Sequence, residues 1–422
     1  MTSRKSKIAY LNSRYSAISH TFIHREVRTL REMGVEVSTI SIRKPENSDL
    51  NSEDAIRESA KTTVLLKSLS SLLGDALIQT LKNPLRAVRG FWQSQKLSPS
   101  GINQMTLHLA YFLEALKLVR YLQKEEISHI HVHMANNAAS VAFIAQHLDP
   151  SLKYSLSIHG PAEFINIENG RLAKKIEAAQ FVRCISEFCR SQIMSVAGIE
   201  QWDKLKVVHC GVETVPAPSV SVRPRNKFLF VGRLVPEKGA FVLLKSLESL
   251  CEKYPDWILE IGGDGPIRQE LERYVSQSLL KTRVHFLGAL PASKVLEKMS
   301  DCDVFVLPSF MEGVPVVLME AMVRAKWVVS TRIAGIPELI EDGQNGFLVS
   351  PGSVSELKTC LEVILNQPKN FLKMGANARE KVEQHFNLEK ETKKLLQLFI
   401  ESNALKIDSN ETNGILNERR AS

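Results

Sequence analysis

The sequence has no apolar run long enough to cross a bilayer. The best candidate, residues 64–81, is interrupted by Lys67 and Asp75, whereas a membrane-spanning helix needs about 20 predominantly apolar residues. The first 14 residues hold too few apolar side chains to form the hydrophobic region of a secretory signal. We therefore expect a cytoplasmic protein, whose contact with the inner face of a membrane, if it makes one, is peripheral.

The sequence also lacks the cysteine patterns of zinc sites and disulfide scaffolds. No C-x-x-C pair is present, and no His-x-x-x-His lies nearby. We expect the cysteines to be small buried side chains in a reducing compartment. The six are Cys184, Cys189, Cys210, Cys251, Cys302 and Cys360.

Two further signals are missing. The glycine-rich segment IGGDGP, residues 261–266, fails the dinucleotide fingerprint because Arg268 stands where the third glycine belongs. A Rossmann site for NAD is therefore disfavoured. The basic residues are not interleaved with aromatic stacking residues, and no nucleic-acid-binding motif is present, so we do not expect a nucleic-acid partner.

The length and the alternation of patterns predict an α/β protein with two domains. A chain of 422 residues exceeds what one hydrophobic core usually serves, and 44% hydrophobic with 24% charged residues is an ordinary globular composition. Short β-rich runs alternate with helical patterns twice, which predicts two doubly wound parallel sheets. The predicted strands are 8–11, 35–42, 127–133, 154–158, 181–185 and 207–210, then 227–231, 257–261, 284–287, 304–307, 328–330 and 346–349.

A proline-rich segment separates the two series. Residues 213–226, ETVPAPSVSVRPRN, carry three prolines and no periodic pattern, so we place the linker there, between an N-terminal domain of residues 1–212 and a C-terminal domain of residues 227–388. A last amphipathic helix is expected within 389–402, and 403–422 is expected to be disordered. Two such sheets would place a ligand-binding cleft at the carboxyl ends of their strands.

The net charge of +8 is concentrated in the first half. Residues 1–200 hold 25 Lys and Arg against 18 Asp and Glu, whereas the remainder holds 29 against 28. Residues 61–96 carry leucines at helical spacing and Phe91 and Trp92 near their end. Basic residues are interspersed with them, including Lys67, Lys82, Arg86, Arg89 and Lys96. This pattern fits a helix pair on an anionic membrane surface, and it equally fits amphipathic helices that pack on a core and present a solvated basic face.

The segment SFMEGVPVVLME, residues 309–320, carries the most chemistry. Pro315 suits the first turn of a helix, and the amides of Val314, Val316 and Val317 would then face outward as an anion site. Glu312, just outside that helix, can meet sugar hydroxyls. Glu320 lies more than one turn deeper and can accept hydrogen bonds from a ribose diol. The pair therefore favours a nucleotide-sugar site, and the alternative is two solvated acids.

The segment FVGRLVPEKG, residues 230–239, places Arg233 and Lys238 beyond the end of a strand. Arg can fork onto phosphate oxygens while Lys acts as a point charge, so the two suit a diphosphate and would stabilise the charge on a leaving nucleotide. The alternative is a solvated basic turn. Gly263 lies in the turn after the next strand and allows the backbone to approach a ligand.

Three histidines lie on strands or at strand ends in the first half. His159 follows the strand 154–158, where it can touch a reacting sugar or serve only the structure. His131 and His133 alternate along one strand and share a face. A metal there would need a third ligand that the sequence does not identify, so we treat them as cleft or core residues.

Taken together, FVGRLVPEKG, IGGDGP, EGVPVVLME and the GIPE and DGQNGFLV segments, in that order over residues 228–349, resemble the family 4 glycosyltransferases, retaining enzymes of the GT-B fold. ISHTFIHREVRTLREMG, HIHVHMANNA, SIHGPAEF and CISEFCR in the first half are similar to the subgroup that builds bacterial exopolysaccharides, including colanic-acid-type enzymes. The resemblance implies two Rossmann-like domains that face a central cleft and bind acceptor and nucleotide sugar respectively.

The resemblance also implies roles for single residues. It assigns the ribose to Glu320 and the diphosphate to Arg233 and Lys238. It assigns the donor sugar to Glu312 and to the backbone of the four residues that follow, Gly313, Val314, Pro315 and Val316. Pro315 has no amide hydrogen to donate. Gly263 would line the donor site, and His159 would lie beside the reacting carbon. No metal or other cofactor is expected, because Arg and Lys take its place.

The implied activity is transfer of a hexosyl group, with retention, from a nucleotide sugar to a lipid-linked or oligosaccharide acceptor. Alternatives are a nucleotide-sugar epimerase of the same fold and a non-catalytic nucleotide-sugar-binding or scaffold protein. The sequence departs from the family at three places, one of which is residues 19–22, where SHTF stands in place of the subgroup's usual SETF. Residues 12–14, Asn-Ser-Arg, replace a frequent Gly-Gly pair, and in AMVRAKW the residues Ala325 and Trp327 replace a Gly and a Pro.

Overall fold

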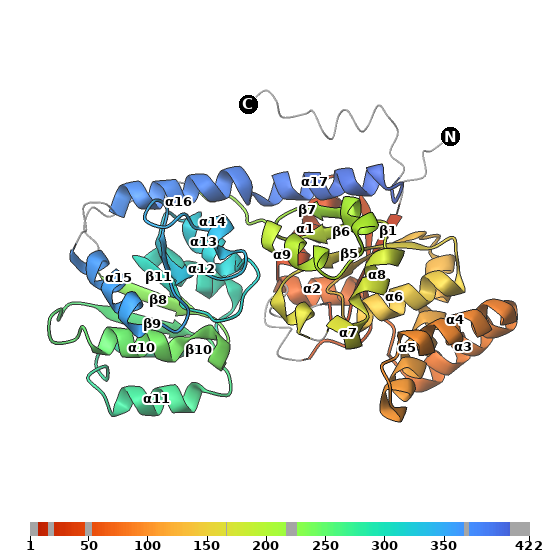
Figure 1. Ribbon diagram of the computed structural model, residues 1–422, viewed down its shortest axis with the longest axis horizontal. Helices are drawn as coiled ribbons and strands as arrows, with labels where there is room; N and C mark the ends of the chain where they lie inside the picture. The colour runs from red at the N-terminus through yellow and green to blue at the C-terminus, as the bar shows by residue number, and fades with distance from the viewer. Residues whose placement is uncertain are drawn as a thin grey trace, which may run out of the picture. The chain divides into compact units, whose positions relative to one another are not determined.

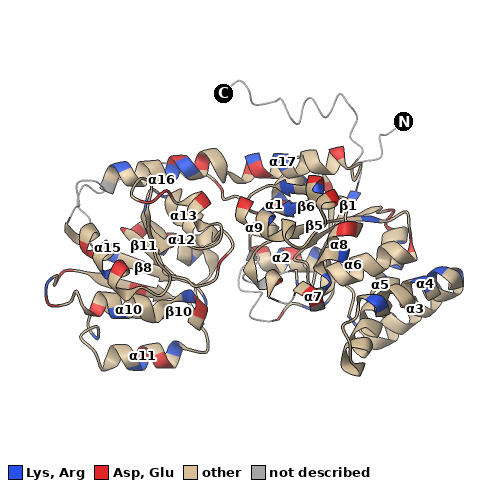
Figure 2. Ribbon diagram, in the orientation of Figure 1, with Lys and Arg blue, Asp and Glu red and all other residues tan. Residues whose placement is uncertain are grey.

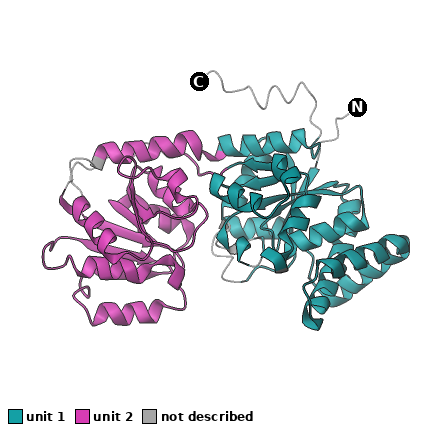
Figure 3. Cartoon of the chain, in the orientation of Figure 1, with its two compact units in different colours: residues 1–208, 389–422 teal, residues 209–388 magenta. Residues whose placement is uncertain are grey.

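The structure is a computed structural model that describes residues 7–15, 21–46, 53–165, 167–216, 226–366 and 371–405. It divides into two compact units, the first made of residues 1–208 and 389–422 and the second of residues 209–388 (Figure 3). Most of the predicted linker and most of the predicted disordered tail lie outside the described residues. The helix within 389–402 belongs to unit 1, although it follows unit 2 in the sequence.

Unit 1 is built on a parallel sheet of seven strands in the order β3-β2-β1-β4-β5-β6-β7 (Figure 1). The strands form where β-branched and aromatic residues run between turns, and the central ones are buried along nearly their whole length. The short β3 was not predicted, and the last strand ends at Val207, where the sequence had suggested that it begins. The strands are β1 Lys7–Asn12, β2 Glu36–Ser41, β3 Thr63–Val64, β4 His129–His133, β5 Lys153–Ile158, β6 Val182–Cys184 and β7 Leu205–Val207.

The helices of unit 1 include a group that the sequence analysis only partly identified. The segment 61–96 contains the end of one helix and most of two others, α3 and α4, while the 23-residue α5 was not predicted. These three helices pack on one another. The helices are α1 Thr21–Glu32, α2 Glu53–Lys61, α3 Leu69–Lys82, α4 Pro84–Leu97, α5 Ile102–Lys124, α6 Asn137–Leu148, α7 Ile167–Gly170, α8 Leu172–Ala178, α9 Glu187–Met194 and α17 Leu388–Glu401, with 3-10 turns at Pro161–Phe164 and Ile199–Lys204.

Helix α17 closes the core of unit 1. Its Leu395, Leu396 and Phe399 are fully buried against β1 and α1, and the ring of Phe399 lies 6.5 Å from that of Tyr10. Burying three such side chains contributes roughly 1.5–3 kcal/mol each. The C-terminal segment is therefore an integral part of the N-terminal unit. Within the described ranges, no helix combines the length and apolar character needed to cross a bilayer.

Unit 2 has a parallel sheet of six strands in the order β10-β9-β8-β11-β12-β13, and all six were predicted (Figure 1). The strands are β8 Lys227–Val231, β9 Ile258–Gly262, β10 Val284–Gly288, β11 Val304–Leu307, β12 Trp327–Thr331 and β13 Phe347–Val349. The helices are α10 Ala240–Glu248, α11 Arg268–Ser276, α12 Ala292–Asp301, α13 Val316–Met322, α14 Ile336–Leu339, α15 Val354–Asn366 and α16 Phe371–His385, with a 3-10 turn at Pro236–Lys238. Helix α16 was not predicted.

The strand orders place one topological switch point in each unit. In unit 1 the order reverses between β1 and β4, and in unit 2 it reverses between β8 and β11. Successive connections leave such a point in opposite directions, so the loops after its two strands diverge and leave room for a ligand at the carboxyl ends. The predicted site segments FVGRLVPEKG and EGVPVVLME follow β8 and β11, so they flank the switch point of unit 2.

Candidate functional site

The loops after β8 and β11 bring two predicted site residues into direct contact. Lys238 Nζ donates a hydrogen bond of 2.6 Å to Oε1 of Glu312, and both side chains are largely buried. The backbone joins the same two loops, because the amide of Phe310 donates to the carbonyl of Glu237 at 2.7 Å. A cation and a carboxylate, 74 positions apart in the sequence, are thus held together at the switch point of unit 2.

Glycines allow the surrounding loops to approach this pair. Gly263 has a φ of 137°, and a Cβ placed on it would lie 1.9 Å from the carbonyl oxygen of Gly232. Gly239 has a φ of 70°, and its Cβ would lie 2.0 Å from the carbonyl oxygen of Pro308. Neither separation is sterically allowed, so both positions require glycine. The turns after β8, β9 and β11 are therefore packed backbone to backbone at one edge of the sheet.

Arg233 lies in the same loop as Lys238 but is exposed, and its side chain makes no hydrogen bond or ion pair with the rest of the described chain. A guanidinium in this state is available to a ligand, and its five donors match the oxygens of a diphosphate. Two cations therefore follow β8: Lys238, which is hydrogen-bonded to Glu312, and Arg233, which is exposed to solvent.

Helix α13 begins directly after Glu312, Gly313, Val314 and Pro315. Pro315 is the residue before the first helical residue, Val316, and not the first helical residue as the sequence suggested. The first amides of the helix have no partner within it, as expected for a helix start. Glu320 lies on this helix, four positions after Val316, and is half-buried.

The loop after β12 lies against the same region. The amide of Gly335 donates to the carbonyl of Gly313 at 3.1 Å, so the predicted GIPE turn supports the backbone of the EGVP segment. The DGQNGFLV segment is held separately, through an ion pair of 2.7 Å between Arg332 and Asp342.

In unit 1, His159 follows β5 as predicted, next to the switch point between β1 and β4. Its backbone amide donates to Oε2 of Glu163 at 2.6 Å, and the other oxygen of Glu163 accepts from the amide of Ala135 at 2.5 Å. One carboxyl group therefore ties the loop after β4 to the loop after β5. Burial raises the pKa of Glu163 to about 7, although these backbone hydrogen bonds oppose the rise.

Lys175 supports the same loop from α8. Its Nζ donates to the carbonyls of Ala135 and Asn136 at 2.9 and 3.1 Å, and the side chain is almost fully buried. Burial lowers the pKa of Lys175 to about 8, and the charge of Glu163 opposes that change. The sequence analysis did not identify Glu163 or Lys175. The role of Glu163 could have been predicted from SIHGPAEF. An acid four positions after a His at a strand end can accept a hydrogen bond from the backbone amide of that His.

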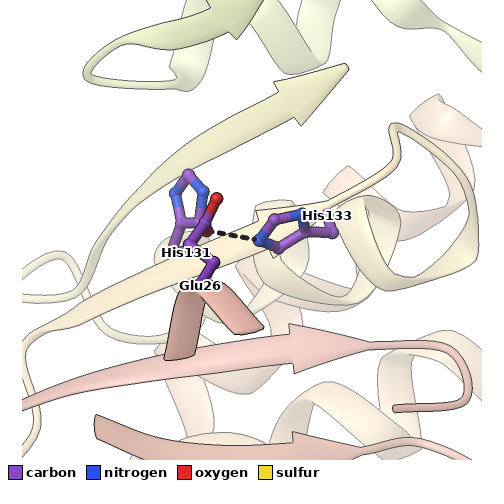
Figure 4. A group of neighbouring side chains, drawn as sticks. All are labelled: Glu26, His131 and His133. Atoms are coloured by element: carbon purple, nitrogen blue, oxygen red, sulfur yellow. Dashed lines mark ion pairs between the residues drawn. The ribbon is translucent and has the colours of Figure 1, made fainter. Parts of the chain in front are cut away.

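The histidines of β4 lie in a buried polar cluster with Glu26 from α1 (Figure 4). His131 bonds to Ser155 and Ser157 on β5 at 2.8 and 2.9 Å, while His133 lies 3.3 Å from Glu26. Glu26 is the third group that a metal site would need and that the sequence did not reveal. Its two oxygens, however, already accept hydrogen bonds from Tyr10 and from Arg183.

Unit 1 also contains a pocket of about 650 Å³ beside the loop after β4. His108 and Tyr111 of α5, Asn136 before α6, and Arg171 and Lys175 at α8 are among its lining residues. Nδ1 of His108 and Nε of Arg171 are buried without a hydrogen-bond partner in the part of the chain that the structure describes. Both atoms are inaccessible to solvent, so they do not face the interior of the pocket.

Helices α3, α4 and α5 carry exposed apolar side chains at helical spacing. Leu69, Leu73, Leu77 and Leu81 form an i, i+4 row on α3, with exposures between 48% and 72%. Leu85, Val88 and Trp92 form a similar row on α4, and Ile102, Met105 and Leu109 lie on α5. Exposed basic residues accompany them: Lys67, Lys82, Arg89 and Lys96. We name the surface formed by these residues the α3–α5 face. Figure 2 colours the Lys and Arg positions of the chain blue.

The fold is shared with solved glycosyltransferase structures. A crystal structure of Anabaena Alr3699/HepE in complex with UDP-glucose superposes with a TM-score of 0.72 over 94% of this chain and 100% of that chain, at 18% identity. At that identity the match shows the fold, which is the GT-B arrangement of two parallel-sheet α/β domains.

Parts of the sequence are similar to known glycosyltransferases. The putative colanic acid biosynthesis glycosyltransferase WcaL of Escherichia coli K12 is 34% identical over 208 residues, which cover 46% of this chain and 51% of that protein. An uncharacterized glycosyltransferase of Methanocaldococcus jannaschii is 26% identical over 277 residues, 64% of this chain and 75% of that protein. The chain thus spans about half to three quarters of these relatives.

The matched family covers the site of unit 2. Residues 213–381 match the family described as Glycosyl transferases group 1, and this range includes Arg233, Lys238, Gly263, Glu312 and Glu320. His159 lies outside the matched range, in unit 1. Residues 213–381 thus match the Glycosyl transferases group 1 family, and the two parallel-sheet units have the GT-B fold.

Proposed function

We propose that this protein transfers a sugar from a nucleotide-sugar donor, with retention at the anomeric carbon, to a lipid-linked or oligosaccharide acceptor in bacterial exopolysaccharide synthesis. The observation that carries the proposal is the contact between Lys238 and Glu312 at the switch point of unit 2, with Arg233 exposed beside it. The arrangement offers cations for a diphosphate and an acid for sugar hydroxyls at one edge of one sheet.

Each donor group has a proposed partner. Arg233 and Lys238 bind the diphosphate, and Glu320 accepts hydrogen bonds from the ribose. Glu312 and the backbone from Gly313 to Val316 contact the donor sugar. The two cations supply the charge that a divalent metal provides in other transferases, because they stabilise the negative charge that builds on the leaving nucleotide.

The proposed reaction is same-face substitution. The acceptor hydroxyl oxygen forms a bond to the anomeric carbon as the bond from that carbon to the phosphate oxygen breaks. The electron pair of the broken bond goes to the leaving phosphate, which takes the proton of the acceptor hydroxyl. We propose that His159 contacts a sugar hydroxyl in this reaction, since it follows β5, the strand next to β4 at the switch point of unit 1.

The acceptor class is supported by unit 1. The pocket beside the loop after β4 is lined by polar residues, among them His108, Asn136 and Lys175, which suit the polar end of an acceptor. The α3–α5 face combines exposed leucines with exposed basic residues, which suits peripheral contact with an anionic membrane. A lipid-linked acceptor presents both kinds of surface, an apolar anchor in the membrane and a polar group above it.

The test is nucleotide release by purified protein from UDP-, GDP- and ADP-sugars, with Glu312→Ala and Lys238→Ala as site variants. Glu270→Ala and Lys245→Ala are matched controls, because both residues are exposed on helices of unit 2 and make no ion pair in the described chain. We expect the site variants to lose at least about 100-fold in turnover, as when a preorganised charge contact to the transition state is removed. Turnover at the wild-type level in both would refute the assigned roles.

The same assay separates the alternatives. Conversion of the donor sugar to an epimer without any acceptor would indicate an epimerase. Binding of a nucleotide sugar without turnover for any acceptor would indicate a binding or scaffold protein. For the transferase, the anomeric configuration of the product, read from its NMR coupling constants, decides whether the configuration is retained.

A further inference from the structure

A buried row of side chains connects Arg183 with His159. Arg183 donates to Oε2 of Glu26, while Nε2 of His133 lies 3.3 Å from Oε1 of the same carboxyl group. Nδ1 of His133 lies 2.9 Å from Nε2 of His159, and the planes of the two rings are inclined by 21°. His133 is the only imidazole in the described chain that bridges a carboxylate and a second imidazole in this way.

Glu26 is ionised in this row. Burial raises its pKa, but the charge of Arg183 and the contact with His133 outweigh burial and hold the pKa well below the ordinary value. An ionised carboxylate has lone pairs and no proton to donate. Tyr10 confirms this polarity from the other side, because its phenol, whose pKa burial and Glu26 raise, donates to Oε1 at 2.9 Å.

A metal ion is a poor alternative at this cluster. Both oxygens of Glu26 are occupied by Tyr10 and Arg183, and both ring nitrogens of His131 lie within 2.9 Å of serine hydroxyls on β5. A cation would displace these hydrogen bonds and would lie close to the guanidinium of Arg183. The donor atoms are therefore already used within the protein, and the cluster needs another explanation.

The ionised carboxylate of Glu26 determines which ring nitrogens of His133 and His159 carry a proton. Nε2 of His133 has no hydrogen-bond partner of good geometry among the described residues, but it lies 3.3 Å from Oε1 of Glu26. A lone pair on Nε2 at that distance would be repelled by the carboxylate, so the ring proton of His133 belongs on Nε2. Burial lowers the pKa of His133, so the ring is neutral and Nδ1 keeps its lone pair. That lone pair can only accept a hydrogen bond, which makes Nε2 of His159 the donor at 2.9 Å.

We infer that Glu26, acting through His133, is a positioning residue that fixes His159 in the tautomer with its proton on Nε2. Nδ1 of His159 is then a hydrogen-bond acceptor. Fixing a ring by a hydrogen bond to its far nitrogen is a general way to set which nitrogen meets a ligand. The inference gives a role to a buried acid, an arginine and a histidine that the donor site of unit 2 does not use.

The consequence for the reaction rests on the proposed function. If His159 contacts the reacting sugar, it presents Nδ1 as an acceptor to a sugar hydroxyl, which donates. The opposite tautomer would present an N–H, which would leave that hydroxyl without its partner. Loss of an outer partner of this kind typically costs about 10- to 100-fold.

The substitution Glu26→Gln gives a test with a definite sign. The amide oxygen must face Arg183, since an amide N–H cannot accept from a guanidinium, so the NH₂ group takes the place of Oε1. It then donates to Nε2 of His133, whose proton moves to Nδ1 and is donated to Nε2 of His159. We therefore expect His159 to change tautomer, with its proton on Nδ1.

The measurement is the ¹⁵N NMR spectrum of the imidazole nitrogens in the full chain, where a protonated and an unprotonated ring nitrogen resonate far apart. His159→Gln assigns the His159 signals by their loss. Glu58→Gln is the matched control, because Glu58 is another arginine-paired acid of unit 1, bonded to Arg31 at 2.8 Å. We expect unprotonated Nδ1 at His159 in the wild type and in Glu58→Gln, and protonated Nδ1 in Glu26→Gln.

Two results would overturn the inference. One is a wild-type His159 that carries its proton on Nδ1, which decides the question even if Glu26→Gln does not fold. The other is a folded Glu26→Gln protein with the wild-type tautomer. In turnover, Glu26→Gln should lower kcat about 10- to 100-fold with an unchanged KM for the donor. If no donor is turned over, the proposed function fails, while the spectrum still tests the tautomer.

Discussion

The two partners of the Lys238–Glu312 pair should have opposite effects on the binding of a nucleoside diphosphate. In the structure, Nζ of Lys238 is bonded to Glu312 at 2.6 Å, so the carboxylate competes with any phosphate for this ammonium group. Lys238→Met removes the cation that a diphosphate needs. Glu312→Gln removes the competing charge and leaves the cation in place, while it weakens the contact with the donor sugar.

The magnitudes follow from the chemistry of the contact. A hydrogen bond to a charged group is worth about 1.5–3 kcal/mol, so Lys238→Met should weaken binding of the nucleoside diphosphate about 10- to 150-fold. The gain from Glu312→Gln is smaller, because the amide still accepts from Lys238. About 1 kcal/mol, or roughly fivefold tighter binding, is expected. Turnover of the nucleotide sugar should nevertheless fall in both variants.

The assay is isothermal titration calorimetry with UDP, GDP and ADP, preceded by a thermal-shift screen to find the base that binds, since a ligand of the folded state raises its melting temperature. Lys245→Met is the control for loss of one positive charge from unit 2, and it should leave the dissociation constant unchanged within about twofold. The reasoning is refuted if Lys238→Met and Glu312→Gln change the affinity in the same direction, or if neither changes it.

Three further outcomes are expected. Ala325 has a φ of 56°, and this left-handed conformation costs about 1–2 kcal/mol for a residue with a side chain. Glycine avoids that cost but loses about 0.5–1 kcal/mol more conformational entropy on folding. Ala325→Gly should therefore raise the free energy of unfolding in urea by about 0.5–1 kcal/mol, whereas the control Ala145→Gly inside α6 should lower it. The double substitution Leu73→Glu and Leu77→Glu on the α3–α5 face should abolish cosedimentation with phosphatidylglycerol vesicles. The control Leu372→Glu changes a leucine of unit 2 that is as exposed as Leu73, and it should not affect cosedimentation. Membrane binding that survives the double substitution would exclude the α3–α5 face as the membrane-binding surface. Burial raises the pKa of Glu163 to about 7, above its unfolded value. Its contribution to stability is therefore full below about pH 4.5 and is lost as the pH rises through 7. Glu163→Gln should flatten the dependence of the free energy of unfolding on pH in this range, and an unchanged slope would contradict the raised pKa.

The convergence of Lys238 and Glu312 could be predicted from the sequence because both residues follow strands in continuous motifs. Lys238 lies seven residues after the end of β8, and Glu312 lies five residues after the end of β11. Parallel strands end at the same edge of a sheet, so two such motifs converge once the strand order brings β8 next to β11. The sequence could not show that the two side chains bond directly, since that depends on the backbone contacts of Gly239 and Gly263.

The parts that escaped prediction depend on long-range contacts or on weak patterns. Glu26 and Arg183 are 157 positions apart and meet only through the packing of α1 on the sheet. Helix α5 has apolar residues on more than one side, because it packs against α3, α4 and α6. Such a helix lacks the single stripe by which an amphipathic helix is recognised in a sequence. Helix α17 was predicted, but its membership of unit 1 was not.

Ala325 and Trp327, which depart from the family pattern, lie just before β12 and at its first residue. Ala325 occupies a left-handed position where the family frequently has glycine, so the substitution costs stability at a turn. Trp327 is fully buried, and its amide donates to the carbonyl of Asp303 at 3.2 Å, a bond that proline cannot make. Both residues lie at or just before the start of β12, so the changes affect the backbone there and not the side chains of the candidate site.

His131 and His133 are two residues apart, share one face of β4 and are both buried, yet the structure gives them different roles. The sequence left them as cleft or core residues, and the distinction lies in what β5 places opposite each. His131 meets Ser155 and Ser157 on β5, which satisfy both its nitrogens. His133, nearer the end of β4, meets His159 just beyond the end of β5, so its second nitrogen is directed at a candidate site residue. His131 is therefore satisfied within the sheet, whereas His133, at the carboxyl edge, lies 3.3 Å from Glu26 on one side and 2.9 Å from His159 on the other.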